Sequence, residues 1–270
     1  MTSSDSDPAA SRPAATSAGT DGFPAALAAF EPATLEEIDR RSALRRRVDT
    51  KYLVPRGRFA EVVEGIDGYE VLEIDGRRSF LYESVYFDTA DLRCFRDHVE
   101  GAERRFKART RYYRETQKCF FEIKVKDGDE TTKRQRDCDV SEHGVMTEAS
   151  REFLREAMGE LVREEPPDDL AAVLSTSFRR ATLSARDGGE RATIDVDLVL
   201  RTMDDRTATL RDDYALVETK SEAGEGELDA ALEAAGCEPA SISKYRLGVG
   251  LLLAEDPESA QQEFLRRRFV

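Results

Sequence analysis

The sequence predicts an α+β fold in which about eight antiparallel strands close into a β-barrel that is flanked by helices. Two observations predict it. Strand-like segments recur along the chain and are separated by turn signals or short helical segments. In several of these segments the charged side chains share one parity and the apolar side chains share the other. This pattern is expected when one face of a closed sheet points inward and the other packs under helices.

The eight predicted strands are rich in β-branched, aromatic or alternating charged residues. They cover residues 45–55, 79–89, 103–114, 118–126, 131–140, 175–185, 191–200 and 214–220. Two hairpin turns are predicted where Gly follows Asp, at Asp127-Gly128-Asp129 and at Asp187-Gly188-Gly189. Helical spacing of apolar residues predicts helices over 34–40, 58–66, 148–164, 227–235 and 243–253.

The 270 residues predict one main domain over 23–255, a disordered tail over 1–22 and a C-terminal helix end or tail over 256–270. No apolar run approaches the roughly 20 residues that a membrane helix needs, and no signal peptide is visible. We therefore expect a cytoplasmic protein that does not insert into a membrane. The four cysteines form no C-x-x-C pair, so we expect reduced and mostly buried thiols rather than a metal or redox motif.

The charge is unevenly distributed. The chain carries a net charge of -14, yet residues 101–136 hold twelve Lys or Arg and only six acidic residues. Acidic surroundings argue against nucleic acid or an anionic membrane as partner, and no exposed aromatic stacking platform for single strands is evident. A local cationic site in an acidic protein instead predicts a compact anionic ligand.

The parity of the charged residues indicates where this site lies. Along one strand Arg105, Lys107, Arg109 and Arg111 share a face, and the same holds for Glu122, Lys124 and Lys126 along the next. An ordinary sheet would expose such a face to water. However, rows of like charges repel unless anions separate them. The pattern therefore favours a charged barrel interior that binds a polyanion.

Nine short motifs occur in order over residues 45–250. They are Arg47-x-Asp49-x-Lys51-Tyr52, Tyr86-Phe87-Asp88-Thr89, His98-x-x-Gly101, Arg105-x-Lys107-x-Arg109-x-Arg111-Tyr112, Phe121-Glu122-Ile123-Lys124-x-Lys126, Lys133-Arg134-x-Arg136, Arg191-x-Thr193-Ile194-Asp195, Glu218-x-Lys220 and Ser241-x-Ser243-Lys244-Tyr245. Together they resemble the VTC domain, the polyphosphate polymerase branch of the triphosphate tunnel metalloenzymes.

The resemblance implies an eight-stranded tunnel barrel, a divalent metal ion (Mn²⁺ or Mg²⁺) and a triphosphate or polyphosphate substrate. Its polymerase branch transfers the γ-phosphoryl group of ATP to a polyphosphate chain. Hydrolase and cyclase relatives begin with Glu-x-Glu-x-Lys, whereas the first position here is Arg47, which favours the polymerase branch. Asp49 is a separate departure, because the first motif of the family usually carries Glu at that position. Any coupling to a membrane would need a separate membrane-protein partner, and the oligomeric state is not predicted.

Phosphoryl transfer depends mainly on charge neutralisation and alignment, so the basic residues are assigned to the phosphates. The predicted catalytic residues are Lys51, Arg109, Arg111 and Lys244. The predicted substrate-binding residues are Arg105, Lys107, Lys124, Lys126, Arg134, Arg136, Arg191 and Lys220. Lys133 and Arg134 have opposite parity, so only one of them can point inward unless the strand bulges.

The resemblance and its inward parity make Glu218 the first candidate for a metal ligand, because hard cations prefer carboxylate oxygens. Glu122, Asp195 and Asp197 are second candidates. They can equally serve as counter-charges within a basic interior. Two alternatives to the polymerase remain open at this point: a triphosphate or polyphosphate hydrolase of the same fold, and a non-catalytic polyphosphate-binding module.

Overall fold

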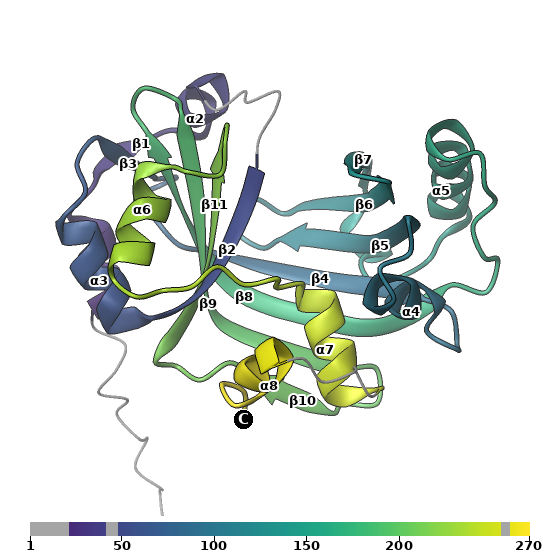
Figure 1. Cartoon of the computed structure of the whole chain (residues 1–270). Helices are drawn as coiled ribbons and strands as arrows, with labels where there is room; N and C mark the ends of the chain where they lie inside the picture. Colours follow the sequence, from purple (N-terminus) through teal and green to yellow (C-terminus); the bar gives the residue numbers. More distant parts are fainter. Residues whose placement is uncertain (1–21, 42–47, 255–259) are drawn as a thin grey trace, which may run out of the picture.

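The computed structural model describes residues 22–41, 48–254 and 260–270, and its main feature is one large curved sheet (Figure 1). Eight strands form a continuous antiparallel path in the order β2-β11-β9-β8-β4-β5-β6-β7. Their bounds are β2 Val48–Pro55, β4 Phe80–Asp88, β5 Arg104–Tyr113, β6 Lys118–Asp127, β7 Glu130–Cys138, β8 Ala171–Ala185, β9 Glu190–Thr202 and β11 Tyr214–Ser221.

All eight predicted strands and their antiparallel arrangement are confirmed. Closure of the barrel is not. Among the described residues β11 is the one strand that pairs with β2, and β6 is the one strand that pairs with β7, so hydrogen bonds do not join the two ends of the path. The sheet curves strongly between these end strands (Figure 1).

Both predicted Gly-containing turns are present. Gly128 joins β6 to β7 with φ 57°, and Gly188 joins β8 to β9 with φ 81°. Positive φ costs Gly little because it lacks Cβ. At the second turn the Asp187 carboxylate also accepts a hydrogen bond from the Gly189 backbone N–H at 2.9 Å, which explains the choice of Asp there.

The outer face of the sheet is apolar and covered by helices. Helices α3 (Arg56–Glu64) and α6 (Glu227–Ala234) pack on one half, where Phe59 and Leu228 join a core cluster with Tyr52 and Ile194. Helix α5 (Glu148–Leu161) covers the other half, where its Leu154 packs in a cluster with Phe121, Ile123 and Val125. These three helices lie within one or a few residues of their predicted ranges.

Two predicted helices lie elsewhere. Helix α2 (Leu35–Arg41) packs through Ile38 against Leu72 and Phe80, and helix α7 (Lys244–Leu252) packs against β8 and β9 near β10. The prediction missed several short elements: α1 (Gly22–Ala28), β1 (Glu31–Ala33), β3 (Tyr69–Leu72), α4 (Arg93–Val99), the 3₁₀ turn η1 (Val140–Glu142), β10 (Thr207–Thr209) and α8 (Ala260–Arg266).

The C-terminal segment was predicted to be a helix end or tail. It forms α8 and then docks onto the sheet, where Val270 exchanges two backbone hydrogen bonds with Thr209, at 2.7 and 2.9 Å. The predicted disordered tail up to residue 21, the start of the first strand at 45–47 and the boundary near 255 lie outside the described residues.

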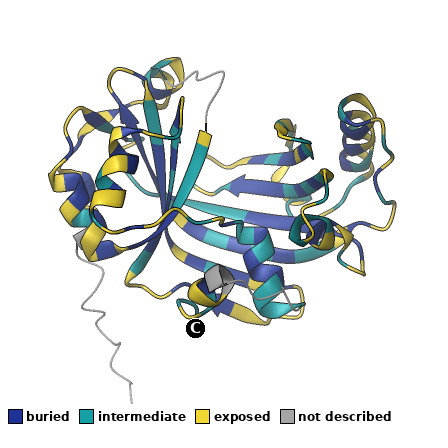
Figure 2. Cartoon of the chain, viewed as in Figure 1, coloured by how far each residue is buried: buried dark blue, intermediate teal, exposed yellow. Residues whose placement is uncertain are grey.

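Burial is greatest in the middle of the sheet and least at its β7 end (Figure 2). Strands β8 and β9 are mostly buried or half-buried, whereas none of the nine residues of β7 is buried. In the part of the chain that the structure describes, no helix has the length and apolar character needed to cross a membrane.

A glycine in α7 allows this helix to approach the sheet. A Cβ atom on Gly248 would lie 2.5 Å from Cδ2 of Leu174. Gly248→Ala is therefore expected to lower the free energy of unfolding by about 1–3 kcal/mol through overpacking, even though Ala favours a helix by about 1 kcal/mol. Urea unfolding measures this.

The matched control is Gly159→Ala in α5, because a Cβ atom at Gly159 would meet nothing within 4 Å. Here only the helix propensity changes, and we expect a gain of up to about 1 kcal/mol. Equal gains at the two positions would contradict the close packing of α7 on the sheet.

Candidate functional site

Charged side chains gather on the face of the sheet opposite α3, α5 and α6, which we call the charged face. Directly opposed residues in antiparallel strands share a face, so the strand register places them. The cations are Lys51, Arg105, Lys107, Arg109, Arg111, Lys118, Lys124, Lys126, Lys133, Arg180, Arg191 and Lys220, and Lys244 joins them from α7. The carboxylates are Asp49, Glu122, Asp137, Asp195 and Glu218.

Glu122 is the central counter-charge on β6, with a side chain only 3% exposed. Its Oε2 atom lies 2.6 Å from Nη2 of Arg109, and its Oε1 atom accepts a hydrogen bond from Nζ of Lys133 at 2.6 Å. Burial opposes its ionisation, but Arg109, Arg111 and Lys133 outweigh burial and hold the pKa of Glu122 well below its ordinary value. The carboxylate therefore stays charged and fixes two cations.

Asp195 has the same role on β9. Both of its oxygens accept hydrogen bonds from Arg180, at 2.6 and 2.7 Å, and Oδ2 also lies 2.5 Å from Nζ of Lys244. Burial would raise the pKa of Asp195, but these two cations lower it well below its ordinary value. The Lys244 ammonium lies 4.5 Å from the ring centre of Phe178, and burial lowers the pKa of Lys244.

A row of lysines crosses the other end of the charged face. Lys107 on β5 is directly opposed to Lys124 on β6, which is directly opposed to Lys133 on β7. The Nζ atom of Lys107 lies 3.2 Å from Oγ of Ser243 and 3.5 Å from Nε2 of His98. Burial, with added repulsion from Lys124 and other nearby cations, lowers the pKa of Lys107 to about 7.

The first residues of α7 attach this helix to the charged face. Tyr245 stacks on Tyr86 with ring centres 5.1 Å apart, and the Tyr86 hydroxyl accepts a hydrogen bond from Arg109 at 2.9 Å. The Tyr245 hydroxyl donates to buried Asp88. Asp88 also accepts from the backbone N–H of Cys94 at 2.8 Å, at the start of α4. The position of Lys244 is therefore set by both neighbouring strands and helices.

Glu218 differs from the two buried carboxylates. It lies on β11 between Lys51, whose Nζ is 3.9 Å from Oε2, and Lys220, which contacts Oε1. Its side chain is 27% exposed, against 3% for Glu122 and for Asp195. Of the predicted metal ligands on the charged face, Glu218 is thus the one most open to an incoming ion.

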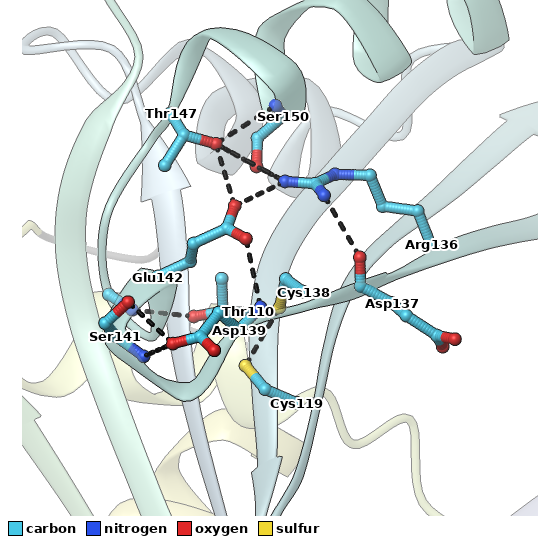
Figure 3. A network of polar contacts seen from close by, with 11 residues as sticks. Thr110, Cys119, Arg136, Asp137, Cys138, Asp139, Ser141, Glu142, Thr147 and Ser150 are labelled. Atoms are coloured by element: carbon cyan, nitrogen blue, oxygen red, sulfur yellow. Dashed lines mark hydrogen bonds and ion pairs between the residues drawn. The ribbon is translucent and has the colours of Figure 1, made fainter.

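Two predicted substrate-binding residues are on the wrong face. Arg134 and Arg136 point to the outer face, toward α5, because side chains alternate along β7 and Lys133 and Gln135 take the inner positions. Arg134 lies 3.8 Å from Glu160. Arg136 is bound 2.5 Å from Glu142 and 3.0 Å from Ser150 (Figure 3). The open choice between Lys133 and Arg134 is thereby settled in favour of Lys133.

Asp197, a second candidate for the metal, is also misplaced. The β8–β9 register shifts at this point, and Asp197 adopts φ 55°. The bulge breaks the alternation that placed it beside Asp195. Its side chain is 52% exposed and pairs with Arg56 at 2.6 Å.

The other predicted residues share the charged face, although their functional roles remain predictions. Arg191 lies near one end, where its guanidinium is 3.3 Å from Asp39 of α2.

The sequence analysis missed Arg180, yet this residue shares parity with Thr182 and Ser184, two small polar residues on β8. That polar alternation is the signal that identifies its face. Only the tertiary structure brings His98 of α4 next to Lys107.

Whether a metal ion can bind on the charged face depends on which side chains are available as ligands. Within residues 22–41, 48–254 and 260–270, no three His, Cys, Asp or Glu side chains are grouped so that they could hold a metal. Glu122 and Asp195 already bind buried cations. Mg²⁺ and similar ions often bind one or two carboxylates, several waters and the phosphates of a substrate. Glu218 fits such an ion, one that arrives with a phosphate ligand.

A comparison with protein families identifies the class of the domain. The family model of the VTC domain matches residues 46–253, which is most of the chain. The protein therefore belongs to the VTC domain family. A search of curated proteins gave no match.

Three solved structures show distant similarity. A candidate adenylate cyclase from Bacillus halodurans has 15% identity and a TM-score of 0.49, covering 73% of this chain and 94% of that chain. A candidate adenylyl cyclase from Hippeastrum, described as having a dominant triphosphatase activity, has 13% identity and a TM-score of 0.48, covering 79% and 99%. A candidate adenylate cyclase from Vibrio parahaemolyticus has 13% identity and a TM-score of 0.42, covering 73% and 94%.

Lys107 should make stability depend on pH. Its pKa falls from 10.5 to about 7 on folding, so between these values the unfolded chain binds more protons and stability rises with pH. Lys107→Met keeps the aliphatic stem and removes the charge. We expect a higher melting temperature than wild type at pH 7 and a smaller difference at pH 10, measured by thermal unfolding.

The same change at Lys118, at the exposed start of β6, is the control. Lys118→Met is expected to leave the pH dependence as in wild type. A Lys107→Met variant that is less stable than wild type at pH 7 would contradict the conclusion that burial and neighbouring cations make the charged Lys107 unfavourable.

Proposed function

We propose that the protein is a metal-dependent enzyme that acts on triphosphate or polyphosphate, and specifically a polyphosphate polymerase that transfers the γ-phosphoryl group of ATP to a polyphosphate chain. The observation that carries the proposal is the register of Lys107, Lys124 and Lys133 across three adjacent strands. Glu122 pairs with Lys133, but Lys107 and Lys124 are directly opposed, and their repulsion adds to the effect of burial on the pKa of Lys107. A polyanion lying across them would remove that repulsion, and membership of the VTC domain family supports the same ligand class.

The arrangement of the arginines suits phosphate oxygens. Glu122 holds Arg109 through Nε and Nη2 and lies 3.9 Å from Nε of Arg111. A guanidinium oriented in this way binds phosphate without first losing much conformational freedom. Because phosphoryl transfer needs charge stabilisation and alignment more than covalent catalysis, Arg109 and Arg111 would bind and orient the phosphates.

Lys244 of α7 and Lys51 of β2 would reach the phosphates from other elements. Lys244 stands at the N-terminus of α7, where the helix dipole adds positive potential, and Asp195 fixes its position. Lys51 lies opposite Glu218 on the neighbouring strand. Glu218 would hold Mn²⁺ or Mg²⁺, which when bound neutralises charge on the phosphate oxygens. Lys51, Lys220 and Arg191 would complete the cationic surround on that side.

The decisive experiment incubates the purified protein with ATP and Mn²⁺ or Mg²⁺, with and without a short polyphosphate primer. Polyphosphate gels are read together with assays of ADP and free phosphate. Long chains with equivalent ADP support the polymerase. Free phosphate without chains would replace it by the hydrolase, and binding of polyphosphate without turnover by the binding module.

Glu218→Gln tests the metal ligand within this assay. The substitution keeps the shape of the side chain and removes its charge, so we expect activity to fall by about 100-fold, as for other groups that stabilise transition-state charge. Glu160→Gln is the matched control on the exposed outer side of α5, and it should retain wild-type activity. Full activity in Glu218→Gln would rule out Glu218 as the metal ligand.

The assignment of faces on β7 can be tested with two adjacent residues. Lys133→Gln should weaken binding of tripolyphosphate about tenfold, the loss expected for one charge-assisted contact. Arg134→Gln removes one positive charge from the neighbouring position on the outer face and should leave the affinity near wild type. Isothermal titration calorimetry measures both. A larger loss in Arg134→Gln than in Lys133→Gln would contradict the binding surface.

A further inference from the structure

Two of the four cysteines are directly opposed on neighbouring strands. Cys119 on β6 pairs in register with Cys138 on β7. The Cys138 thiol donates a hydrogen bond to Cys119, with the two Sγ atoms 2.9 Å apart (Figure 3). Both residues are free thiols in the structure. The other two cysteines lie in different elements: Cys94 in α4 and Cys237 after α6.

The strand geometry already suits a covalent bond. Opposed residues of an antiparallel pair have Cα atoms about 4.5 or 5.5 Å apart. Both separations fall within the range of about 4.4–6.8 Å that disulfides span. The two thiols also point toward each other, so the bond needs no movement of the backbone.

The two thiols differ in accessibility. Cys138 is half-buried on β7, the end strand of the sheet, whereas Cys119 on the neighbouring strand β6 is only 4% exposed. Burial raises the pKa of both thiols. Glu142 raises it further at both positions, and Arg136 opposes the rise at Cys138. Both groups therefore rest as protonated thiols, and an incoming reagent reaches Cys138 first.

We propose that Cys119 and Cys138 form a site for a cross-strand disulfide, made by exchange with a small-molecule disulfide, that ties β7 to β6. The Cys138 thiol loses its proton, and its sulfur attacks one sulfur of the reagent, forming a mixed disulfide and releasing one thiol. Cys119 then loses its proton and attacks Sγ of Cys138, releasing the second thiol. Two electrons pass to the reagent, which is reduced to two thiols.

The bond would fix the part of the sheet that has least support. Strand β7 has a single partner strand and none of its residues is buried. Beyond the β6 ladder, Arg136 contacts Glu142 of η1 and Ser150 of α5 and so anchors the C-terminal end of β7 to these two elements (Figure 3). Strand β7 also carries Lys133 on the charged face, so a tie at Cys138 restrains that position. This inference does not rest on the proposed function.

The test treats the full chain with oxidised glutathione at mildly alkaline pH and follows its intact mass. We expect the loss of two hydrogens and, after proteolysis without reductant, a peptide pair joined through Cys119 and Cys138. Cys138→Ser should abolish this product. Cys94→Ser, which alters a buried cysteine elsewhere, should form it as wild type does.

A stable glutathione adduct on Cys138, four unmodified thiols or a bond between other cysteines would each overturn the proposal. Its structural consequence has a separate readout. Backbone amides of β7 should exchange hydrogen more slowly in the oxidised protein and regain their original rate after reduction. Unchanged exchange along β7 in the cross-linked protein would show that the bond forms without holding the strand.

Discussion

Two buried carboxylates hold the charged face together. Glu122 and Asp195 each form ion pairs with two basic side chains from other elements: Arg109 and Lys133 in one case, Arg180 and Lys244 in the other. Buried charges are tolerated only when they are paired and hydrogen-bonded. Without these carboxylates these arginines and lysines of four elements, β5, β7, β8 and α7, would lack their counter-charges, and the arrangement of the middle of the sheet and of α7 would be destabilised.

The start of α7 depends on the same interactions. Three consecutive residues contact three different strands: Ser243 reaches Lys107 on β5, Lys244 reaches Asp195 on β9, and Tyr245 reaches Asp88 at the end of β4. Ser243 is also the N-cap of the helix, so the residue that begins α7 is among those that attach it to the sheet. Through these contacts the start of α7 connects β4, β5 and β9, and the charged side chains of these elements form one continuous cationic surface.

Period-two alternation predicted the eight strands, the covered outer face and most of the charged face. The prediction of faces failed where a bulge interrupts the alternation and where residues were assigned by family motif. A bulge at Asp197 reverses the face within β9, and no propensity marks that bulge in advance. Arg134 and Arg136 were assigned by family motif, and parity showed only that Lys133 and Arg134 could not both point inward; the strand pairing and the contact of Lys133 with Glu122 decide the face. The short elements β1, β3 and α4 form through tertiary contacts, so local sequence could not predict them.

The positions of the carboxylates bear on the proposed binding of an extended anion. Glu122 and Asp195 partly offset the charges nearest to them, Lys133 among these, but Lys107 and Lys124 belong to the next row on the same face, two residues along each strand, where β5, β6 and β7 present three lysines side by side. A single small anion could neutralise only part of this row, whereas a chain of linked phosphates could span it. Because a ligand that binds only the folded state stabilises it, relief of this repulsion would favour folding and polyanion binding together.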